Sequence, residues 1–253
     1  MGARRPLIAG NWKMYGRHAS LSEIAALWAS VENAAAAVDV LVCPPAVFVA
    51  QAVWGARSTG VAIGGQDCSP AAEDAARTGE VSAAMLADVG ARYVIVGHSE
   101  RRSLHGESDE LVARKAQAAL AAAITPIICV GETQAERAAG RVGEVVARQV
   151  RDSVPDGATA VVVAYEPVWA IGGNSTPTVA EIEDVHALVR RTLAARLGGA
   201  AAEAVPILYG GSVGPKNAGE IFTAQGVDGA LVGRASLKAA DFAAIILAHP
   251  AAG

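Results

Sequence analysis

The sequence has few cysteines, and none of its histidines is placed to bind a metal. Only three of the 253 residues are cysteines, Cys43, Cys68 and Cys129, and they are widely spaced. An odd number of separated thiols argues against a disulfide framework and fits reduced cysteines in a cytoplasmic protein. The five histidines show no metal-ligand spacing with one another or with the cysteines. We therefore expect a cytoplasmic protein without a metal site.

The chain also lacks a large excess of charge of one sign and any long apolar run. The net charge is −4, with acidic and basic residues mixed along the chain. No basic stripe alternates with aromatic residues, so we expect no nucleic-acid partner. No uncharged apolar run approaches the roughly 20 residues of a membrane-spanning helix, and the run 7–9 is too short for a signal peptide. We therefore expect no membrane partner.

What the chain does have is a regular alternation of two kinds of segment. Hydrophobic residues make up 52% of it. Short strand-like runs recur about every 30 residues, the length of one strand–helix unit. They begin near Leu7, Val38, Val61, Tyr93, Thr125, Ala160, Pro206 and Gly229. Alanine-rich segments with helical periodicity lie between them, for example 21–28 and 179–197.

Eight strands alternating with helices can form either a closed (β/α)8 barrel or an open doubly wound sheet. No strand is followed by a G-x-G-x-x-G turn, which weakens the dinucleotide-binding open sheet. No break in composition marks a linker or a second domain. The sequence therefore favours an α/β fold with one barrel domain over residues 1–253.

In such a barrel the active site lies where the strands end. Polar residues and glycines gather at these predicted ends, whereas the strand interiors are apolar. They are Asn11 and Lys13, Gln66 and Asp67, His98, Ser99 and Glu100, Cys129 and Glu132, Glu166, Gly210 to Ser212, and Gly233 with Arg234. This asymmetry predicts a functional site on that face.

Glu166 is the most informative residue of this face. It follows the predicted buried strand 161–165, and a loop that is rigid at Pro167 and permissive at Gly172 comes next. A carboxylate and an imidazole, here Glu166 and His98, can divide proton abstraction from proton delivery. Lys13 could stabilise developing negative charge. Taken singly, each has an ordinary alternative: a capping carboxylate, a structural histidine or a solvated lysine.

Two glycine turns suggest a phosphate site. Gly210-Gly211-Ser212-Val213 and Leu231-Val232-Gly233 end the last two predicted strands. Backbone without side chains can approach an anion closely, and barrels frequently bind phosphate after strands seven and eight. Each turn alone could be an ordinary tight turn.

Taken together, these blocks resemble the triosephosphate isomerase family. The similarity extends from Ala9-Gly10-Asn11-Trp12-Lys13-Met14 to Ala235-Ser236-Leu237 and includes Val96 to Arg102, the Glu166 segment and Tyr209 to Val213. The resemblance implies a TIM barrel, usually a cytoplasmic homodimer without a cofactor. It also implies interconversion of dihydroxyacetone phosphate and glyceraldehyde 3-phosphate, a step of glycolysis and gluconeogenesis.

The resemblance also assigns roles to residues. Glu166 matches the general base, His98 the neutral electrophile and Lys13 an electrostatic stabiliser. Asn11, Gly172, Ser212 and Gly233 match substrate-binding positions, and Glu100 supports Lys13 or the substrate oxygens. Thr78 matches the loop tip that reaches into the neighbouring subunit. The lid would have hinges at 167–169 and 175–177 and its tip at 170–174.

Some positions depart from the family pattern. Tyr15 replaces a common asparagine, and Asn174 stands where glycine is common. Pro177 has no N–H, so we expect the usual latch between the lid and the residue matching Tyr209 to be absent or shifted. Arg234 replaces a common second glycine, and its side chain either points away or adds charge near the phosphate.

Two other functions fit the same residues. A four-carbon sugar phosphate could be isomerised with the same base, electrophile and phosphate site, because one extra carbon changes only pocket contacts. A barrel that has lost catalysis could serve as a scaffold, but such a protein has no need to keep Lys13, His98 and Glu166 together.

Overall fold

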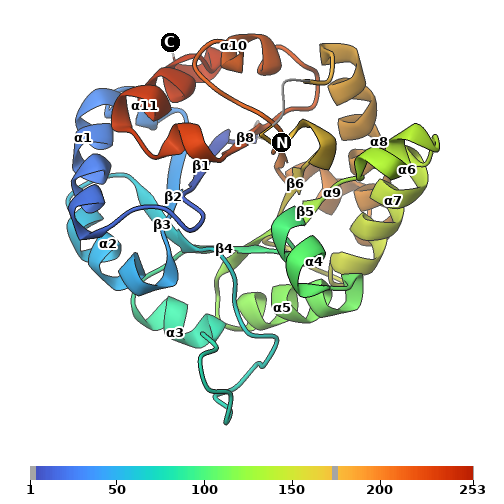
Figure 1. Ribbon diagram of the computed structural model, residues 1–253. Helices are drawn as coiled ribbons and strands as arrows, with labels where there is room; N and C mark the ends of the chain where they lie inside the picture. The colour runs from blue at the N-terminus through green and yellow to red at the C-terminus, as the bar shows by residue number, and fades with distance from the viewer. Residues whose placement is uncertain (1–3, 173–175, 253) are drawn as a thin grey trace.

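The computed structural model describes residues 4–172 and 176–252, and its central feature is a closed barrel of parallel strands (Figure 1). The strands pair in chain order, and β8 returns to pair with β1. They are β1 (Leu7–Asn11), β2 (Asp39–Cys43), β3 (Ala62–Gly65), β4 (Tyr93–Val96), β5 (Thr125–Val130), β6 (Val162–Tyr165), β7 (Ile207–Tyr209) and β8 (Gly229–Val232). The predicted barrel is confirmed, and the open sheet is excluded.

Four of the strands begin at the predicted residue, and the other four begin one or two residues later. At β2 the cause is visible in the hydrogen bonds. The Val38 N–H donates to Ala34 O at 3.1 Å and closes the preceding turn, so pairing starts only where the Asp39 N–H donates to Pro6 O at 2.8 Å. A buried β-branched residue therefore belongs to the turn rather than to the strand.

Helices surround the barrel on its outer side (Figure 1). The α-helices are α1 (Ser22–Val31), α2 (Val49–Ala56), α3 (Ala83–Asp88), α4 (Ser99–His105), α5 (Asp109–Ala121), α6 (Gln134–Ala138), α7 (Val142–Ser153), α8 (Val179–Leu197), α9 (Gly199–Ala204), α10 (Ala218–Ile221) and α11 (Ala239–Leu247). Short 3-10 turns are η1 (His18–Leu21), η2 (Ala34–Ala36), η3 (Ala46–Phe48), η4 (Val168–Ala170), η5 (Arg234–Ser236) and η6 (Pro250–Ala252). None of the helices within the described ranges has the length and apolar character needed to cross a membrane.

The strands alternate between two apolar layers. In β1, Leu7 and Ala9 belong to the cluster inside the barrel, whereas Ile8 belongs to the larger cluster between strands and helices. Successive side chains of a strand point to opposite faces, so a strand covered on both faces is apolar throughout. This is why the strands read as continuous apolar runs in the sequence.

Helix α8 illustrates how the periodic segments form the outer layer. Its bounds match the predicted segment, and a capping box between Thr178 and Glu181 begins it. The expected apolar face is buried, namely Ile182, Val185, Val189 and Leu193. The segment predicted at 21–28 is also helical, but Leu21 closes η1 and α1 begins at Ser22.

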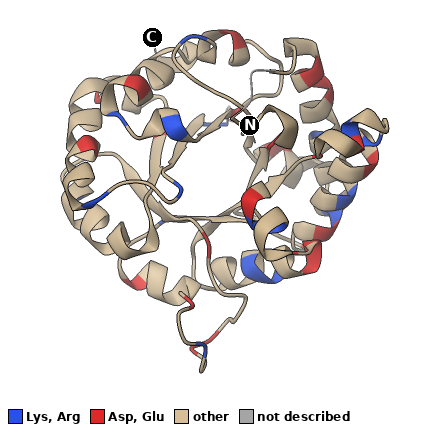
Figure 2. Cartoon of the chain, in the orientation of Figure 1, with Lys and Arg blue, Asp and Glu red and all other residues tan. Residues whose placement is uncertain are grey.

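Residues 69–80, called the finger below, project from the ring between α3 and α5 (Figure 1). Most of the finger is exposed, including Thr78. Elsewhere, basic and acidic residues are interspersed along the outer helices α5, α7 and α8 (Figure 2). That mixture is typical of a solvated surface.

Candidate active site

The C-terminal ends of the strands bring most of the candidate residues to one mouth of the barrel. Asn11 is the last residue of β1, and Lys13 follows two residues later. His98 lies between β4 and α4, and Glu166 comes directly after β6. Because all eight strands are parallel, these ends share one face of the barrel.

His98 and Glu166 form a buried pair. The His98 Nε2 atom lies 2.9 Å from Glu166 Oε1, and the two residues are only 5% and 2% exposed. The second carboxylate oxygen, Oε2, accepts a hydrogen bond from the Ser99 backbone N–H at 2.9 Å. Both oxygens of the carboxylate are therefore held by groups that belong to the segment after β4.

The helix α4 fixes which nitrogen of His98 carries a proton. His98 is the N-cap of α4, and its Nδ1 atom accepts a hydrogen bond from the Glu100 N–H at 3.2 Å. A helix N-terminus disfavours positive charge, so Nδ1 has no proton and Nε2 donates to Glu166. Burial lowers the pKa of His98, and the charge and hydrogen bond of Glu166 raise it by more, so the pKa lies above its ordinary value.

The Glu166 carboxylate is stabilised as an anion in spite of its burial. Burial raises the pKa of Glu166, but His98 and the Ser99 N–H lower it by more, so the pKa lies below its ordinary value. The backbone is held as tightly as the side chain. The Glu166 N–H donates to Val130 O at 2.7 Å, and a Cβ atom on Gly131 would lie only 1.7 Å from Glu166 O. Only glycine fits at position 131.

Lys13 has a backbone conformation that is uncommon outside glycine. Its φ is 52°, in the left-handed region. Two side chains hold both of its backbone polar groups: its N–H donates to Asn11 Oδ1 at 2.9 Å, and its carbonyl accepts from Gln66 Nε2 at 2.9 Å. The ammonium group lies 2.5 Å from Glu100 Oε1. The Asn11 and Gln66 side chains thus hold the strained backbone of Lys13 at the mouth of the barrel.

The candidate phosphate residues are only partly brought together. Gly233 lies next to Lys13, because a Cβ on Gly233 would be 3.5 Å from Lys13 Cε. Ser212 is in the loop after the neighbouring strand β7, and Asn217 closes this loop by donating to Ser212 O at 3.0 Å. Gly172 is exposed with a φ of 67°, and a Cβ there would meet no atom of the described residues within 4 Å.

The first predicted hinge of the lid is anchored to a buried carboxylate. Glu132 is fully buried and accepts hydrogen bonds from Trp169 Nε1 at 2.8 Å and from the Tyr165 hydroxyl. The Arg137 guanidinium stacks on the Trp169 ring at 4.3 Å from its centroid. The expected lid residues 173–175 lie outside the described residues.

The sequence placed several further residues at this face without giving them a role. Two of them are Gln66, which binds the Lys13 carbonyl, and Glu132, which binds the Trp169 indole. Their roles could not be predicted from the sequence, because each contact joins segments far apart in the chain. Thr78 is on the exposed finger and does not line the cavity that contains Asn11, Lys13 and His98 in the same chain. Within the described ranges, no three His, Cys, Asp or Glu side chains gather as a metal site.

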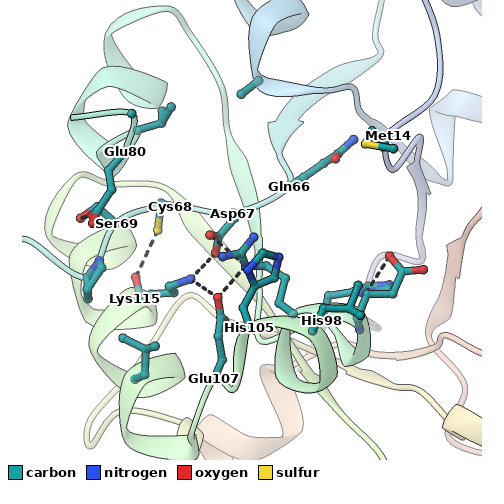
Figure 3. A pocket seen from close by; sticks show the side chains of 18 of the residues that line it. Met14, Gln66, Asp67, Cys68, Ser69, Glu80, His98, His105, Glu107 and Lys115 are labelled. Carbon is teal, nitrogen blue, oxygen red and sulfur yellow. Dashed lines mark hydrogen bonds and ion pairs between the residues drawn. The ribbon is translucent and has the colours of Figure 1, made fainter. Parts of the chain in front are cut away.

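A groove connects the mouth with the base of the finger (Figure 3). The cavity has a volume of about 770 Å³ and includes Asn11, Lys13, His98 and Glu100 in its lining. At its other end Lys115 is buried between Asp67 and Glu107, with 2.6 Å to each. The Oε2 atom of Glu107 is buried and has no hydrogen-bond partner among the described residues.

Comparisons of the sequence and of the structure with known proteins all match triosephosphate isomerases. The family model described as triosephosphate isomerase matches residues 6–249. The triosephosphate isomerase of Afipia carboxidovorans is 56% identical over 98% of this chain and 99% of that protein, and that of Chelativorans sp. is 55% identical over 95% of each. The crystal structure of triosephosphate isomerase from Bartonella henselae superposes with a TM-score of 0.89 at 42% identity, covering 96% of this chain and 98% of that one.

Proposed function

Because the chain belongs to the triosephosphate isomerase family, we propose that it interconverts dihydroxyacetone phosphate and D-glyceraldehyde 3-phosphate through an enediolate. Glu166 is the general base, His98 the electrophile and Lys13 the electrostatic stabiliser. The observation that supports these roles most directly is the buried His98–Glu166 contact of 2.9 Å at the mouth of the barrel.

The proton transfers follow from the protonation states of the pair. Glu166 is an anion of lowered pKa and can take a proton from a substrate carbon once it turns away from Ser99 and His98. The His98 Nε2–H then donates to the substrate carbonyl instead of to Glu166. Once Glu166 has turned away, the contact that raises the His98 pKa is lost, and burial and the Lys13 charge favour the neutral ring. A neutral imidazole can donate its proton to one substrate oxygen and take a proton back from the other.

Charge stabilisation comes from Lys13. Its ammonium group is held 2.5 Å from Glu100, and only 22% of its side chain is exposed. A fixed cation in a partly dry site stabilises a developing enediolate more than it would in water, because no solvent has to reorganise. Glu100 orients the ammonium group, and the strained backbone of Lys13 sets the direction of the chain.

The phosphate is bound by the loops after β6, β7 and β8, with Gly172, Ser212 and Gly233 as the substrate-binding residues. This assignment is supported by the position of Gly233 beside Lys13 and by the preference of barrels for phosphate at the last two loops. A lid over residues 167–177 excludes water, which protects an enediolate phosphate from losing its phosphate.

A coupled assay tests the proposed reaction. The purified protein is given D-glyceraldehyde 3-phosphate and, separately, a four-carbon aldose phosphate. Fast turnover of the triose, lost by at least about 1,000-fold in Glu166→Gln, is the expected result, because the amide cannot take a proton. Turnover of the tetrose alone would change the substrate, and activity on neither would favour a scaffold.

The active form is a homodimer in which the finger of one copy enters the groove of the other. Exposed apolar side chains support this arrangement: Met14 and Leu104 line the groove and are 92% and 77% exposed. Glu107, whose Oε2 atom has no hydrogen-bond partner in the described part of the chain, also lines this groove. Apolar patches rimmed by polar groups are typical of protein–protein interfaces.

Leu104→Glu tests the dimer. A charge in the groove disfavours burial against a second copy, so we expect a monomer by analytical ultracentrifugation and a large loss of turnover. The control is Leu247→Glu on α11, where the leucine is 50% exposed and does not line the groove. Identical sedimentation of the two variants would argue against this interface.

A further inference from the structure

The strands β4 and β5 stop pairing with each other shortly before the chain reaches His98. Their last paired residues are Val96 and Ile128. The first residue after β4 is Gly97, whose φ of 65° turns the chain toward His98. A residue with a side chain does not fit there, because a Cβ on Gly97 would lie 2.6 Å from Val112. The ladder therefore ends at Val96, two residues before the candidate electrophile His98.

Arg102 binds both strands at the point where the ladder ends. Its Nε atom donates to Gly97 O at 2.9 Å, and its Nη2 atom donates to Cys129 O at 3.1 Å. Gly97 and Cys129 are the first residues after the last pair. One guanidinium group thus bridges two carbonyl oxygens where backbone pairing has stopped.

The other side of the guanidinium is anchored to the helical layer. Nη1 donates to Asp109 Oδ1 of α5 at 2.6 Å, and Nη2 also donates to Ser153 Oγ of α7 at 3.1 Å. The Arg102 side chain is only 15% exposed and Asp109 is 6% exposed. A planar guanidinium with donors fixed in one plane can hold such an arrangement, whereas an ammonium group cannot.

Both carbonyls are next to the reacting pair. Gly97 directly precedes His98 in the chain. Cys129 precedes Val130, whose carbonyl accepts the hydrogen bond of the Glu166 N–H at 2.7 Å. A change in the distance between these two strand ends therefore changes the position of His98 relative to Glu166.

We propose that Arg102 is a positioning residue for the isomerisation: its bridge between Gly97 O and Cys129 O sets the separation of His98 and Glu166. This inference rests on the proposed function and adds to it a residue that does not touch the substrate. The phosphate loops belong to other strands, so the bridge acts on proton transfer and leaves phosphate binding unchanged.

The test compares Arg102→Lys with Arg148→Lys. Arg148 binds the other oxygen of Asp109 but touches neither strand end, which makes it a matched control. We expect Arg102→Lys to lower kcat about 10- to 100-fold with KM within about twofold, since a displacement near 1 Å has effects of this size. Arg148→Lys should leave kcat and KM unchanged.

A second readout does not depend on turnover. The imidazole N–H signal of His98 in ¹⁵N-histidine spectra should shift or broaden in Arg102→Lys and stay in place in Arg148→Lys. If the wild-type protein failed to isomerise trioses, the proposed function would be wrong, and this signal would still test the bridge.

Two results would overturn the inference. Wild-type kcat in Arg102→Lys together with a lower Tm would make Arg102 a purely structural residue. An equal loss of kcat in both variants would assign the effect to the charges around Asp109 rather than to the bridge.

Discussion

At Lys13 the backbone is strained at a position where the proposed chemistry uses a long cationic side chain. A left-handed conformation costs a residue with a Cβ about 1–2 kcal/mol, and glycine adopts it freely. The Asn11 and Gln66 hydrogen bonds hold the strained backbone in place. The strain at this position lowers the stability of the fold and places a positive charge at the mouth of the barrel.

This strain predicts an inverted order of stability for two variants. Alanine usually stabilises a site relative to glycine, but here Lys13→Gly should be more stable than Lys13→Ala by about 1 kcal/mol, because only alanine keeps the strain. Urea unfolding at one fixed protein concentration measures the difference. The opposite order would mean that the backbone at residue 13 relaxes in the variants.

His186 is a buried histidine that the catalytic proposal does not use. Its Nδ1 atom lies 3.0 Å from Gly226 O, and Nε2 has no hydrogen-bond partner among the described residues. Burial lowers the pKa of His186 to about 4, although the Gly226 carbonyl raises it somewhat. The folded protein therefore keeps this ring neutral at pH values where the unfolded chain protonates it.

A pH dependence of stability follows from that difference. Above pH 6.5 the ring is neutral in both states, so His186 contributes no pH dependence. Between about pH 6.5 and 4 only the unfolded state takes up the proton, so the free energy of unfolding should fall by roughly 2–3 kcal/mol. In His186→Asn, urea unfolding should show a fall smaller by that amount. An unchanged pH slope would contradict the assignment.

At the scale of elements, the two hinges of the proposed lid differ in their contacts. The first hinge is attached to Glu132 through Trp169. For the second hinge the expected latch is the Tyr209 hydroxyl, which is buried without a hydrogen-bond partner among the described residues. Pro177 is buried and offers no N–H.

Tyr209→Phe should therefore have little effect on turnover in this protein. We expect kcat within about twofold of wild type and a free energy of unfolding higher by roughly 1 kcal/mol, because removal of an unpaired buried hydroxyl relieves its desolvation cost. In a Pro177→Ala background, which restores an N–H, the same substitution should lower kcat. A tenfold loss of kcat in the single variant would show that Tyr209 has another partner in the closed lid.

The elements were largely predictable, and the contacts between them were not. Periodicity located all eight strands and the bounds of α8, since both depend on local burial patterns. The bonds of Glu166 to Ser99 and of Arg102 to Cys129 join residues 67 and 27 positions apart. The carbonyl of Lys13, a residue with positive φ, accepts a hydrogen bond from Gln66, 53 positions away. No local pattern encodes such contacts.

At the scale of the whole molecule, the net charge of −4 opposes the approach of a dianionic substrate. Arg234 is exposed and follows Gly233, which lies beside Lys13. For an enzyme at the diffusional ceiling of kcat/KM, the rate of encounter with the substrate decides the outcome. A cation at the rim of the mouth should then increase kcat/KM.

Arg234→Gln should lower kcat/KM about two- to fivefold at low ionic strength, and the difference from wild type should disappear at high salt. Arg191→Gln is the control, because Arg191 is an exposed cation on α8. Steady-state rates over a series of salt concentrations measure both. A loss in Arg234→Gln that persisted at high salt would indicate direct phosphate contact instead of steering.

The closure of the barrel between β1 and β8 has a consequence for the protein's synthesis. Asn11 and Lys13 come from the first strand, and Gly233 follows the last one, which pairs with the first. A ribosome adds about 5–20 residues per second, so the first strand must wait about 10–50 seconds before its second neighbour is made. A nascent chain can thus fold helix–strand units early, but it cannot assemble this mouth. We expect ribosome-bound chains truncated before residue 229 to be inactive, and activity to appear only once β8 is present to pair with β1.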